Sequence, residues 1–431
     1  MIHFNRPYMT GKETEYIRQA VQDGKISGNG EFTKRCQDYF EKRYGFRKCL
    51  LTTSCSDALE MAAILTDVGP GDEVIVPSYT FVSSALAFVR QGATLVFADS
   101  RADHPGIDED AIESLVTPRT KVVVVVHYAG VACDMDKVMA VANRHDLLVV
   151  EDAAQAVDSF YIAGDGAPAS KTGTPEDGAP ASKTGTKKSQ QVGRDVLGAP
   201  RKPLGSIGHL AAFSFHETKN IISGEGGLLV VNDERFVRRA EIIWEKGTNR
   251  AEFFRGEVNK YGWVDTGSSF LPTEIVSAFL WAQLEHLDEI QAERKRLWNR
   301  YLDFFTELKK SDPALDGLKL PVIPGYATNN AHMFYLLFPD LATRTEFIAQ
   351  MKARDILTVF HYLPLHSSAF YRKYRETHRP MVDDATRQLP NCDRYADTLV
   401  RLPMYCGLAP DQEKVIAAAR DVLAGIAAKN R

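Results

Sequence analysis

The first half of the chain alternates between short apolar runs and longer segments with apolar residues at helical spacing. Five consecutive valines, residues 122–126, are typical of a strand that is covered on both faces. Strands that alternate with helices predict an α/β protein with a doubly wound, mostly parallel sheet. The predicted strands cover residues 49–51, 73–76, 95–98, 122–126, 147–150, 210–215 and 228–231, and helices cover residues 80–91, 109–116 and 137–145.

The remainder of the chain predicts a second, smaller unit. Residues 273–310 carry apolar side chains on one helical face and are expected to connect two domains. We therefore expect a large domain over residues 1–272, the connecting helical region, and a smaller C-terminal α/β domain over residues 311–431. In this smaller domain, strands are predicted near residues 333–338 and 357–362, and helices near residues 344–354 and 410–427.

A low-complexity insertion at about residues 161–204 interrupts the large domain. It contains the same ten residues twice, at 165–174 and 177–186, and few large apolar side chains. Such a segment cannot offset its ordering entropy, so a mobile loop is expected. Its Ser-Lys-Thr is unlike a phosphate-binding loop, because Ser170 and Ser182 stand where that loop requires glycine.

Composition excludes several classes of protein. The 431 residues are 44% hydrophobic with a net charge of -4, so there is no basic footprint for nucleic acid or anionic lipid. No apolar run reaches membrane-span length and no signal peptide is evident, so no membrane association and a cytoplasmic location are expected. The six cysteines form neither a Cys-x-x-Cys pair nor a metal-ligand cluster, and reduced thiols without a metal are expected. A nicotinamide dinucleotide fingerprint is absent.

Four polar or aromatic candidates fall at predicted strand ends and helix starts. Lys219 lies in a glycine-rich turn between two apolar runs, where lost hydration would favour the free amine, although a solvated loop lysine is the simpler alternative. Asp152 ends a predicted strand, and Phe81 follows another. Ser56 opens a hydroxyl-rich helix start that could bind an anion, or that is simply a capped helix.

Together these four residues are the parts that hold pyridoxal 5'-phosphate. A lysine forms the imine, and an ionised Asp152 keeps the ring nitrogen protonated, which the cofactor requires as an electron sink. An ion pair at ~4 Å in an effective dielectric near 20 is worth about 4 kcal/mol, enough to fix that protonation state. The ring of Phe81 could stack on the cofactor, and the helix start could bind its phosphate.

Four motifs carry a family resemblance that runs over nearly the whole chain outside residues 161–200. They are residues 77–82 (Pro-Ser-Tyr-Thr-Phe-Val), 151–155 (Glu-Asp-Ala-Ala-Gln), 213–220 (Phe-Ser-Phe-His-Glu-Thr-Lys-Asn) and 224–227 (Gly-Glu-Gly-Gly). In order and spacing the chain resembles the DegT/DnrJ/EryC1/StrS sugar aminotransferases, which have the type I, aspartate aminotransferase-like fold. The resemblance implies that Lys219 and Asp152 are catalytic and that Gln155 contacts the ring hydroxyl.

The same resemblance assigns the remaining sites. It implies phosphate contacts from Ser56, Asp57 and Ser214, and a contact to a neighbouring subunit's phosphate from the position of Ser269. Two departures stand out: serine replaces the asparagine common at 269, and Asp57 replaces a small apolar residue, so its carboxylate must turn away from the phosphate. Substrate contacts are expected from Lys246, Arg250, Arg255, His361 and His366, with solvated charges or packing histidines as the alternatives.

The resemblance implies a PLP-dependent transaminase that moves the amino group of L-glutamate to C4 of a nucleotide-linked 4-keto-6-deoxy sugar, expected to be dTDP-4-keto-6-deoxyglucose. A homodimer with shared sites is expected, with residues 247–269 reaching the neighbour. Three alternatives remain. They are a 3-keto sugar aminotransferase, a sugar dehydratase of the same fold, against which Lys219 argues because that branch carries histidine there, and a non-catalytic cofactor-binding regulator.

Overall fold

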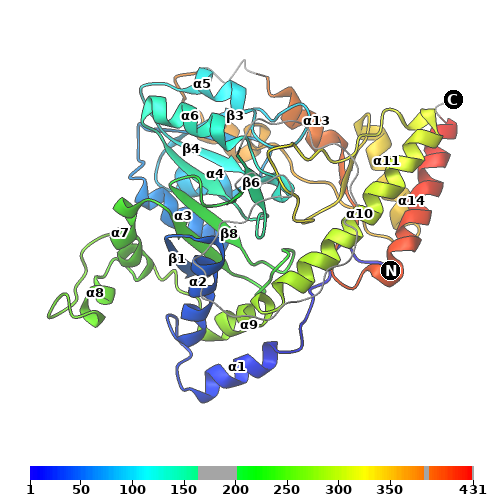
Figure 1. Cartoon of the computed structure of the whole chain (residues 1–431). Coiled ribbons are helices and arrows are strands. Elements are labelled where there is room, and N and C mark those ends of the chain that lie inside the picture. Colours follow the sequence, from blue (N-terminus) through cyan, green and yellow to red (C-terminus); the bar gives the residue numbers. More distant parts are fainter. Residues whose placement is uncertain (164–200, 383–387, 430–431) are drawn as a thin grey trace.

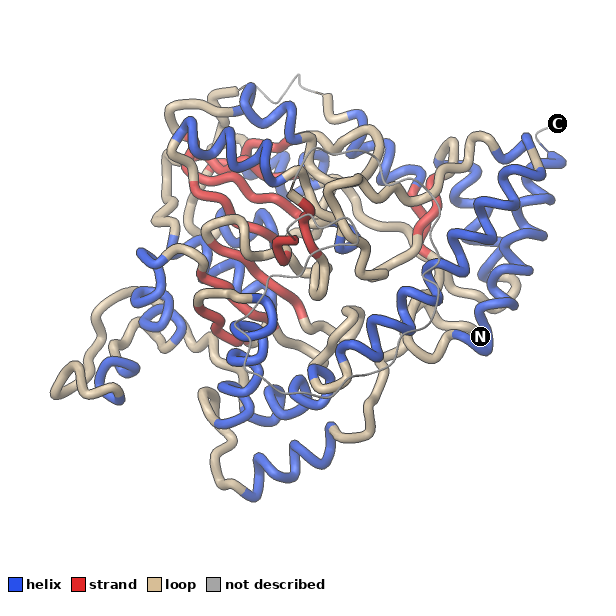
Figure 2. The backbone as a smooth tube through the Cα atoms, viewed as in Figure 1, coloured by secondary structure: helices blue, strands red, loops and turns tan. Residues whose placement is uncertain are grey.

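The computed structural model describes residues 1–163, 201–382 and 388–429. Its centre is a seven-stranded sheet of order β1-β9-β8-β5-β4-β2-β3, with helices on both sides (Figures 1 and 2). β9 is antiparallel to both of its neighbours, and the other paired strands are parallel. The strands are β1 Lys48–Thr52, β2 Glu73–Pro77, β3 Thr94–Ala98, β4 Thr120–Val126, β5 Leu148–Asp152, β8 Leu210–Ser214 and β9 Gly227–Val231. The predicted mostly parallel sheet is confirmed.

Burial explains why these apolar runs became central strands. All five valines of β4 are buried, between β2 on one side and β5 on the other. Helices α3, α4, α5, α6 and α7 come from the segments between strands, and α3 packs against β8 and β9. Their bounds are α3 Cys55–Leu65, α4 Ser83–Val89, α5 Ile112–Leu115, α6 Met135–His145 and α7 Glu234–Trp244.

The predicted helical region over residues 273–310 is two helices, α9 Glu274–Leu284 and α10 Leu287–Ser311. α9 packs against α1 Glu13–Gln22 and α2 Glu31–Tyr44. The buried carboxylate of Glu274 caps α2, since it accepts from the backbone N–H groups of Gly30 at 2.9 Å and Phe32 at 2.7 Å. A side chain at position 30 would collide with this carboxylate, which explains the glycine.

The C-terminal region is built on a small antiparallel sheet, in which β10 Tyr335–Leu337 pairs with β11 Leu399–Arg401. The strand predicted near residues 357–362 is wrong. Val359 forms one isolated bridge with Arg401, and the chain then leaves the ladder, which carries His361 to the hydroxyl of Tyr128. The helices here are α11 Leu341–Lys352, α12 Ala369–Tyr374, α13 Pro390–Thr398 and α14 Ala409–Lys429, and α10 runs from the large sheet to this region (Figure 1).

Both edges of the predicted insertion are β-strands. β6 Phe160–Ile162 and β7 Arg201–Pro203 are antiparallel strands, so the expectation of a loop over all of residues 161–204 is wrong at both edges. The tandem repeat itself lies outside the described residues. Within the described ranges, no helix is both long and apolar enough to span a membrane. The six cysteines are free thiols, and all except Cys55 are buried.

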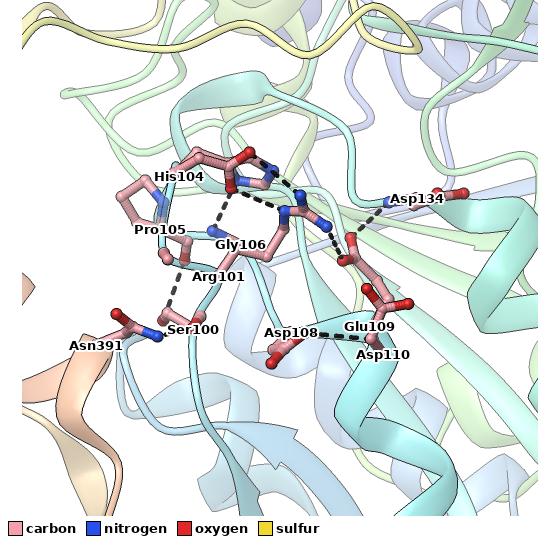
Figure 3. Close-up of polar contacts among 12 residues, drawn as sticks. Ser100, Arg101, His104, Pro105, Gly106, Asp108, Glu109, Asp110, Asp134 and Asn391 are labelled. Carbon is pink, nitrogen blue, oxygen red and sulfur yellow. Dashed lines mark hydrogen bonds and ion pairs between the residues drawn. The ribbon is translucent and has the colours of Figure 1, made fainter. Parts of the chain in front are cut away.

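The loop after β3 is held by a polar network, which we call the β3 joint: the charged side chains of Arg101, Asp103 and Glu109, together with the neutral His104 (Figure 3). The Arg101 guanidinium donates to Asp103 at 2.9 Å and to Glu109 at 3.1 Å. The other carboxylate oxygen of Glu109 accepts from the backbone N–H of Asp134 at 2.6 Å, at the start of α6. The joint therefore ties the end of an edge strand to a helix on the next layer.

Candidate active site

A cavity of about 700 Å³ opens beyond the carboxyl ends of β4, β5 and β8. This is where ligands bind in doubly wound sheets. Segments from the C-terminal region and from the first residues of the chain complete its walls. Seven residues that sequence analysis singled out line this cavity: Ser56, Phe81, Asp152, Gln155, Ser214, Lys219 and His361.

Asp152 is the last residue of β5 and is only 5% exposed. Its Oδ2 accepts a hydrogen bond from the Ser84 hydroxyl at 2.6 Å, and its Oδ1 accepts from the backbone N–H of Ala154 at 3.0 Å. The Ser84 hydroxyl is itself within 2.9 Å of the Thr80 hydroxyl. These bonds fix the plane of the carboxylate. Within the described ranges, no Lys, Arg or His forms an ion pair with it.

Lys219 follows the end of β8 in a tight turn, in which its backbone N–H donates to the carbonyl of His216 at 2.9 Å. Burial lowers the pKa of Lys219, an effect opposed by the nearby Cys55 and Asp152 and reinforced by the positive charge of Arg401. Its ammonium group forms neither a hydrogen bond nor an ion pair with the residues that the structure describes. A free amine is therefore accessible nearer neutral pH than in a surface lysine.

The start of α3 forms another part of the cavity wall. Ser54 caps the helix by accepting from the Asp57 backbone N–H at 3.1 Å, which leaves the N–H groups of the first two helical residues for a ligand. The Ser56 and Ser83 hydroxyls lie 2.6 Å apart and both line the cavity. Asp57 does not line it, because its carboxylate turns to the Thr53 hydroxyl. The Asp57 carboxylate is thus turned away from the cavity, as expected for an acidic residue that stands beside a phosphate site.

Gln155 and Phe81 lie on two further walls. The Gln155 Oε1 accepts from the Ala129 backbone N–H at 2.6 Å, and its Nε2 donates to the Tyr362 hydroxyl at 3.2 Å. The Phe81 ring is 54% exposed and its centroid lies 6.1 Å from that of Tyr362. A large apolar ring left in the open beside a cavity provides a stacking surface for a planar ligand.

Six of the predicted residues do not line this cavity, and Asp57, described above, is one of them. Arg250 and Arg255 belong to the segment around α8 Arg250–Phe254, which projects away from the sheet (Figure 1). Lys246 and Ser269 lie beside the end of α7, where Glu245 forms a bridge with Ser269 and the Lys246 N–H donates to the Ser268 carbonyl. Arg255 pairs with Glu241 and Glu257, and Arg250 with Glu245. His366 lies 2.7 Å from the Ser78 hydroxyl and also pairs with Asp393. Their roles stay predictions.

The structure adds cavity residues that sequence reasoning missed. Arg401, His332, Tyr362, Phe4 and Asn5 all line the cavity. Tyr362 lies directly after His361 and could have been proposed with it. Burial lowers the pKa values of His332 and His361 well below the ordinary value, so both imidazoles are neutral at pH 7. Arg401 carried no signal, because its strand was not predicted.

These residues fit pyridoxal phosphate at each of its groups. A buried carboxylate stands at one end of a strand, an amine of lowered pKa stands near it, and hydroxyls surround a helix N-terminus. The Gly227 position shows how closely β9 approaches that helix start, since an added Cβ would lie 2.4 Å from the Ser54 carbonyl carbon. No group of three or more His, Cys, Asp or Glu in the described part of the chain is arranged to hold a metal.

Comparison with known families agrees with this reading. The chain belongs to the DegT/DnrJ/EryC1/StrS aminotransferase family, whose model matches residues 7–420. It is therefore a PLP-dependent sugar aminotransferase, and the expected family, enzyme class and cofactor are confirmed.

Individual relatives match along almost their whole length. The chain is 30% identical to GDP-perosamine synthase of Caulobacter vibrioides, covering 97% of each chain. It is 29% identical to the spore coat polysaccharide biosynthesis protein SpsC of Bacillus subtilis, covering 98% of this chain and 97% of that one.

The fold is shared with solved aminotransferases. The PLP form of the sugar aminotransferase Spr1654 from Streptococcus pneumoniae superposes with a TM-score of 0.79 at 22% identity, over 99% of each chain. The aminotransferase TlmJ from Streptoalloteichus hindustanus gives 0.78 at 24% identity, over 99% of this chain and all of the other. The type I fold is confirmed.

Proposed function

We propose that the protein transfers the amino group of L-glutamate to C4 of a nucleotide-linked 4-keto-6-deoxy sugar, with dTDP-4-keto-6-deoxyglucose as the expected acceptor. The main support for the transamination chemistry is that Lys219 and Asp152 line one cavity of about 700 Å³. Support for a nucleotide sugar comes from GDP-perosamine synthase, whose name specifies a GDP-linked amino sugar. A GDP-linked acceptor is therefore the second candidate.

The chain's own groups divide the work. When bound, pyridoxal phosphate supplies the electron sink that stabilises negative charge on a substrate carbon. Lys219 Nζ, whose pKa burial lowers, takes the proton from the α-carbon of the donor and returns a proton to C4 of the acceptor. Asp152, held by Ser84 and Ala154, keeps a proton on the ring nitrogen through its negative charge. Phe81 and the α3 N-terminus fix the orientation of the reacting atoms.

We infer a homodimer from the projecting segment around α8. It exposes Phe254 at 70% and Trp263 at 85%, which is more apolar surface than a free loop normally shows. A second copy seated there would bury these rings and bring Ser269 and Arg250 towards the partner's cavity. Light scattering is expected to give twice the chain mass, and an active monomer would refute this assembly.

The acceptor is tested with the purified, PLP-loaded protein, L-glutamate and a panel of keto sugars. The panel holds dTDP-linked and GDP-linked 4-keto-6-deoxyhexoses and a dTDP-linked 3-keto sugar, and the amino sugar formed is identified by mass spectrometry and NMR. A 4-amino product with the dTDP sugar is expected. A product only from the GDP sugar changes the nucleotide, and one only from the 3-keto sugar overturns the C4 assignment. Lys219→Ala is the control for background reaction.

A further inference from the structure

Arg401 is a cation without a counter-charge in the wall of the cavity. It ends β11, and its Nε is inaccessible to solvent and has no hydrogen-bond partner. The guanidinium forms no ion pair with any residue in the described ranges. Burial lowers the pKa of Arg401, although a guanidinium stays charged in proteins. Burying a charge without a counter-charge costs free energy, unless a bound ligand supplies the opposite charge.

Within the described part of the chain, the groups around Arg401 do not supply that counter-charge. The Tyr128, Tyr362 and Tyr79 hydroxyls are its electrostatic neighbours, and burial raises the pKa of each, so all three are neutral at pH 7. The Tyr79 hydroxyl also has no hydrogen-bond partner. Lys219, which lines the same cavity, is a cation itself.

The two carboxylates that line the cavity have other partners. Asp152 accepts from Ser84 and Ala154, and Glu225 lies 3.7 Å from His216. An anion that meets Arg401 must therefore come with the ligand. The cofactor phosphate has its own donors at the start of α3, which leaves a substrate anion for Arg401.

We propose that Arg401 binds the α-carboxylate of the amino donor. The planar guanidinium presents paired N–H donors that match a carboxylate bidentately. The donor's amino group reacts at the position of Lys219, and its α-carboxylate is attached to the same carbon as that amino group. Arg401 and Lys219 line the same cavity, so an α-carboxylate held by Arg401 lies in the cavity that also holds the reacting amine. This proposal rests on the proposed function.

Phe4 is the positioning residue for this cation. Its ring lies under the Arg401 guanidinium, with 4.5 Å between the guanidinium carbon and the ring centroid. The arm that carries Phe4 is fixed on both sides, because the Ile2 N–H donates to the Asp355 carbonyl at 2.6 Å and the Asn5 side chain donates to the Glu217 carbonyl at 3.0 Å. The first residues of the chain thus hold the guanidinium plane towards the cavity.

The test separates the two half-reactions. Arg401→Gln and Arg401→Lys are compared with wild type and with Arg354→Gln, which removes an exposed arginine. In the glutamate half-reaction, followed by stopped-flow absorbance, kcat/KM is expected to fall about 10- to 100-fold for Arg401→Gln, the size of a lost bidentate charge-assisted contact. Arg401→Lys should recover part of the loss. The keto-sugar half-reaction of the pre-loaded amino form should change less than about twofold.

A second measurement uses the wild-type protein and does not depend on variants. Phenylglyoxal modifies accessible arginines, and the modified peptides are quantified by mass spectrometry with and without 2-oxoglutarate, the deaminated donor. Protection of Arg401 that is absent for Arg354 supports the proposal. Equal modification of Arg401 in both samples overturns it.

The remaining outcomes are also decisive. Loss confined to the keto-sugar half-reaction would assign Arg401 to the acceptor's diphosphate and overturn this proposal while leaving the aminotransferase function intact. Absence of any reaction of wild type with glutamate, while another amino donor reacts, would instead refute the proposed donor. Phe4→Leu should raise the KM for glutamate several-fold with kcat nearly unchanged, and an unchanged KM would remove the positioning role of Phe4.

Discussion

Two arginines of this protein show opposite uses of a partly buried charge. In the β3 joint, Arg101 contacts two carboxylates, Asp103 and Glu109, and the Glu109 side chain is fully buried (Figure 3). In the cavity, Arg401 has a buried nitrogen without a partner and no carboxylate of the described chain pairs with it. The paired cation is part of the fold, whereas the unpaired one marks a place where a ligand brings the negative charge.

The buried histidines of the β3 joint and of the cavity are alike in charge, unlike the two arginines. Burial lowers the pKa of His104 in the β3 joint to about 4, and it lowers those of His332 and His361 in the cavity well below the ordinary value. None of the three carries charge at pH 7. Lys219 and Arg401 are the lysine and the arginine among the described residues that line the cavity, and burial lowers the pKa of Lys219.

The largest expected effect is on catalysis at Lys219. Lys219→Ala should reduce turnover by about 10⁵-fold or more, as expected when a covalent nucleophile is removed. Lys137→Ala, which removes a surface lysine paired with Asp110, should leave turnover unchanged. The measurement is amino-sugar formation with excess PLP, with circular dichroism to confirm folding. Near-normal turnover of Lys219→Ala would place the chemistry elsewhere.

The next effect concerns Asp152. Asp152→Asn removes a charge worth about 4 kcal/mol at contact distance, so kcat should fall about a thousandfold. Ser84→Ala keeps the charge and removes one hydrogen bond to it, and a loss of about tenfold is expected. Steady-state kinetics of both variants gives this graded series. Equal losses in the two would show that the charge of Asp152 is not what matters.

The comparison itself is tested by stability. Arg101→Met leaves the buried Glu109 carboxylate without its cation, and the free energy of unfolding should fall by about 2–4 kcal/mol. Arg401→Met removes a charge that has no counter-charge in the described part of the chain, so its stability without ligand should be unchanged or higher. Urea unfolding of both PLP-free variants measures the difference. A large loss of unfolding free energy in Arg401→Met would show that Arg401 stabilises the fold, and would contradict the difference proposed between the two arginines.

The smallest effect is a pH dependence from His104. Because its folded pKa of about 4 lies below the ordinary 6.5, its contribution to stability is complete above about pH 6.5 and is lost as pH falls towards 4. His104→Asn keeps an acceptor for the Gly106 N–H and removes the titration. Between about pH 6 and 4.5, the variant should lose less stability than wild type, by about 1 kcal/mol per pH unit. Parallel stability curves would contradict this assignment.

The site residues that follow strands of the large sheet or open its helices could be predicted from the sequence. The site residues that the C-terminal region contributes could not. Lys219, Asp152, Phe81 and Ser56 each follow an apolar run or open a helix, and parallel strands place such ends at one edge. Arg401 was missed because three-residue β11 carries too short a pattern and its neighbour at 357–362 was mistaken for the strand. The helical region over residues 273–310 was predictable from its apolar spacing, and that spacing continues across the break between α9 and α10.

The central claim is that Lys219 holds the cofactor covalently. The PLP-loaded protein is reduced with borohydride, digested and mapped by mass spectrometry, with Lys219→Ala as the control. The account predicts that the reduced phosphopyridoxyl group is found on the peptide that contains Lys219 and nowhere else in stoichiometric amount. Stoichiometric labelling of another lysine, or a wild-type protein that binds PLP without any reducible linkage, would contradict it.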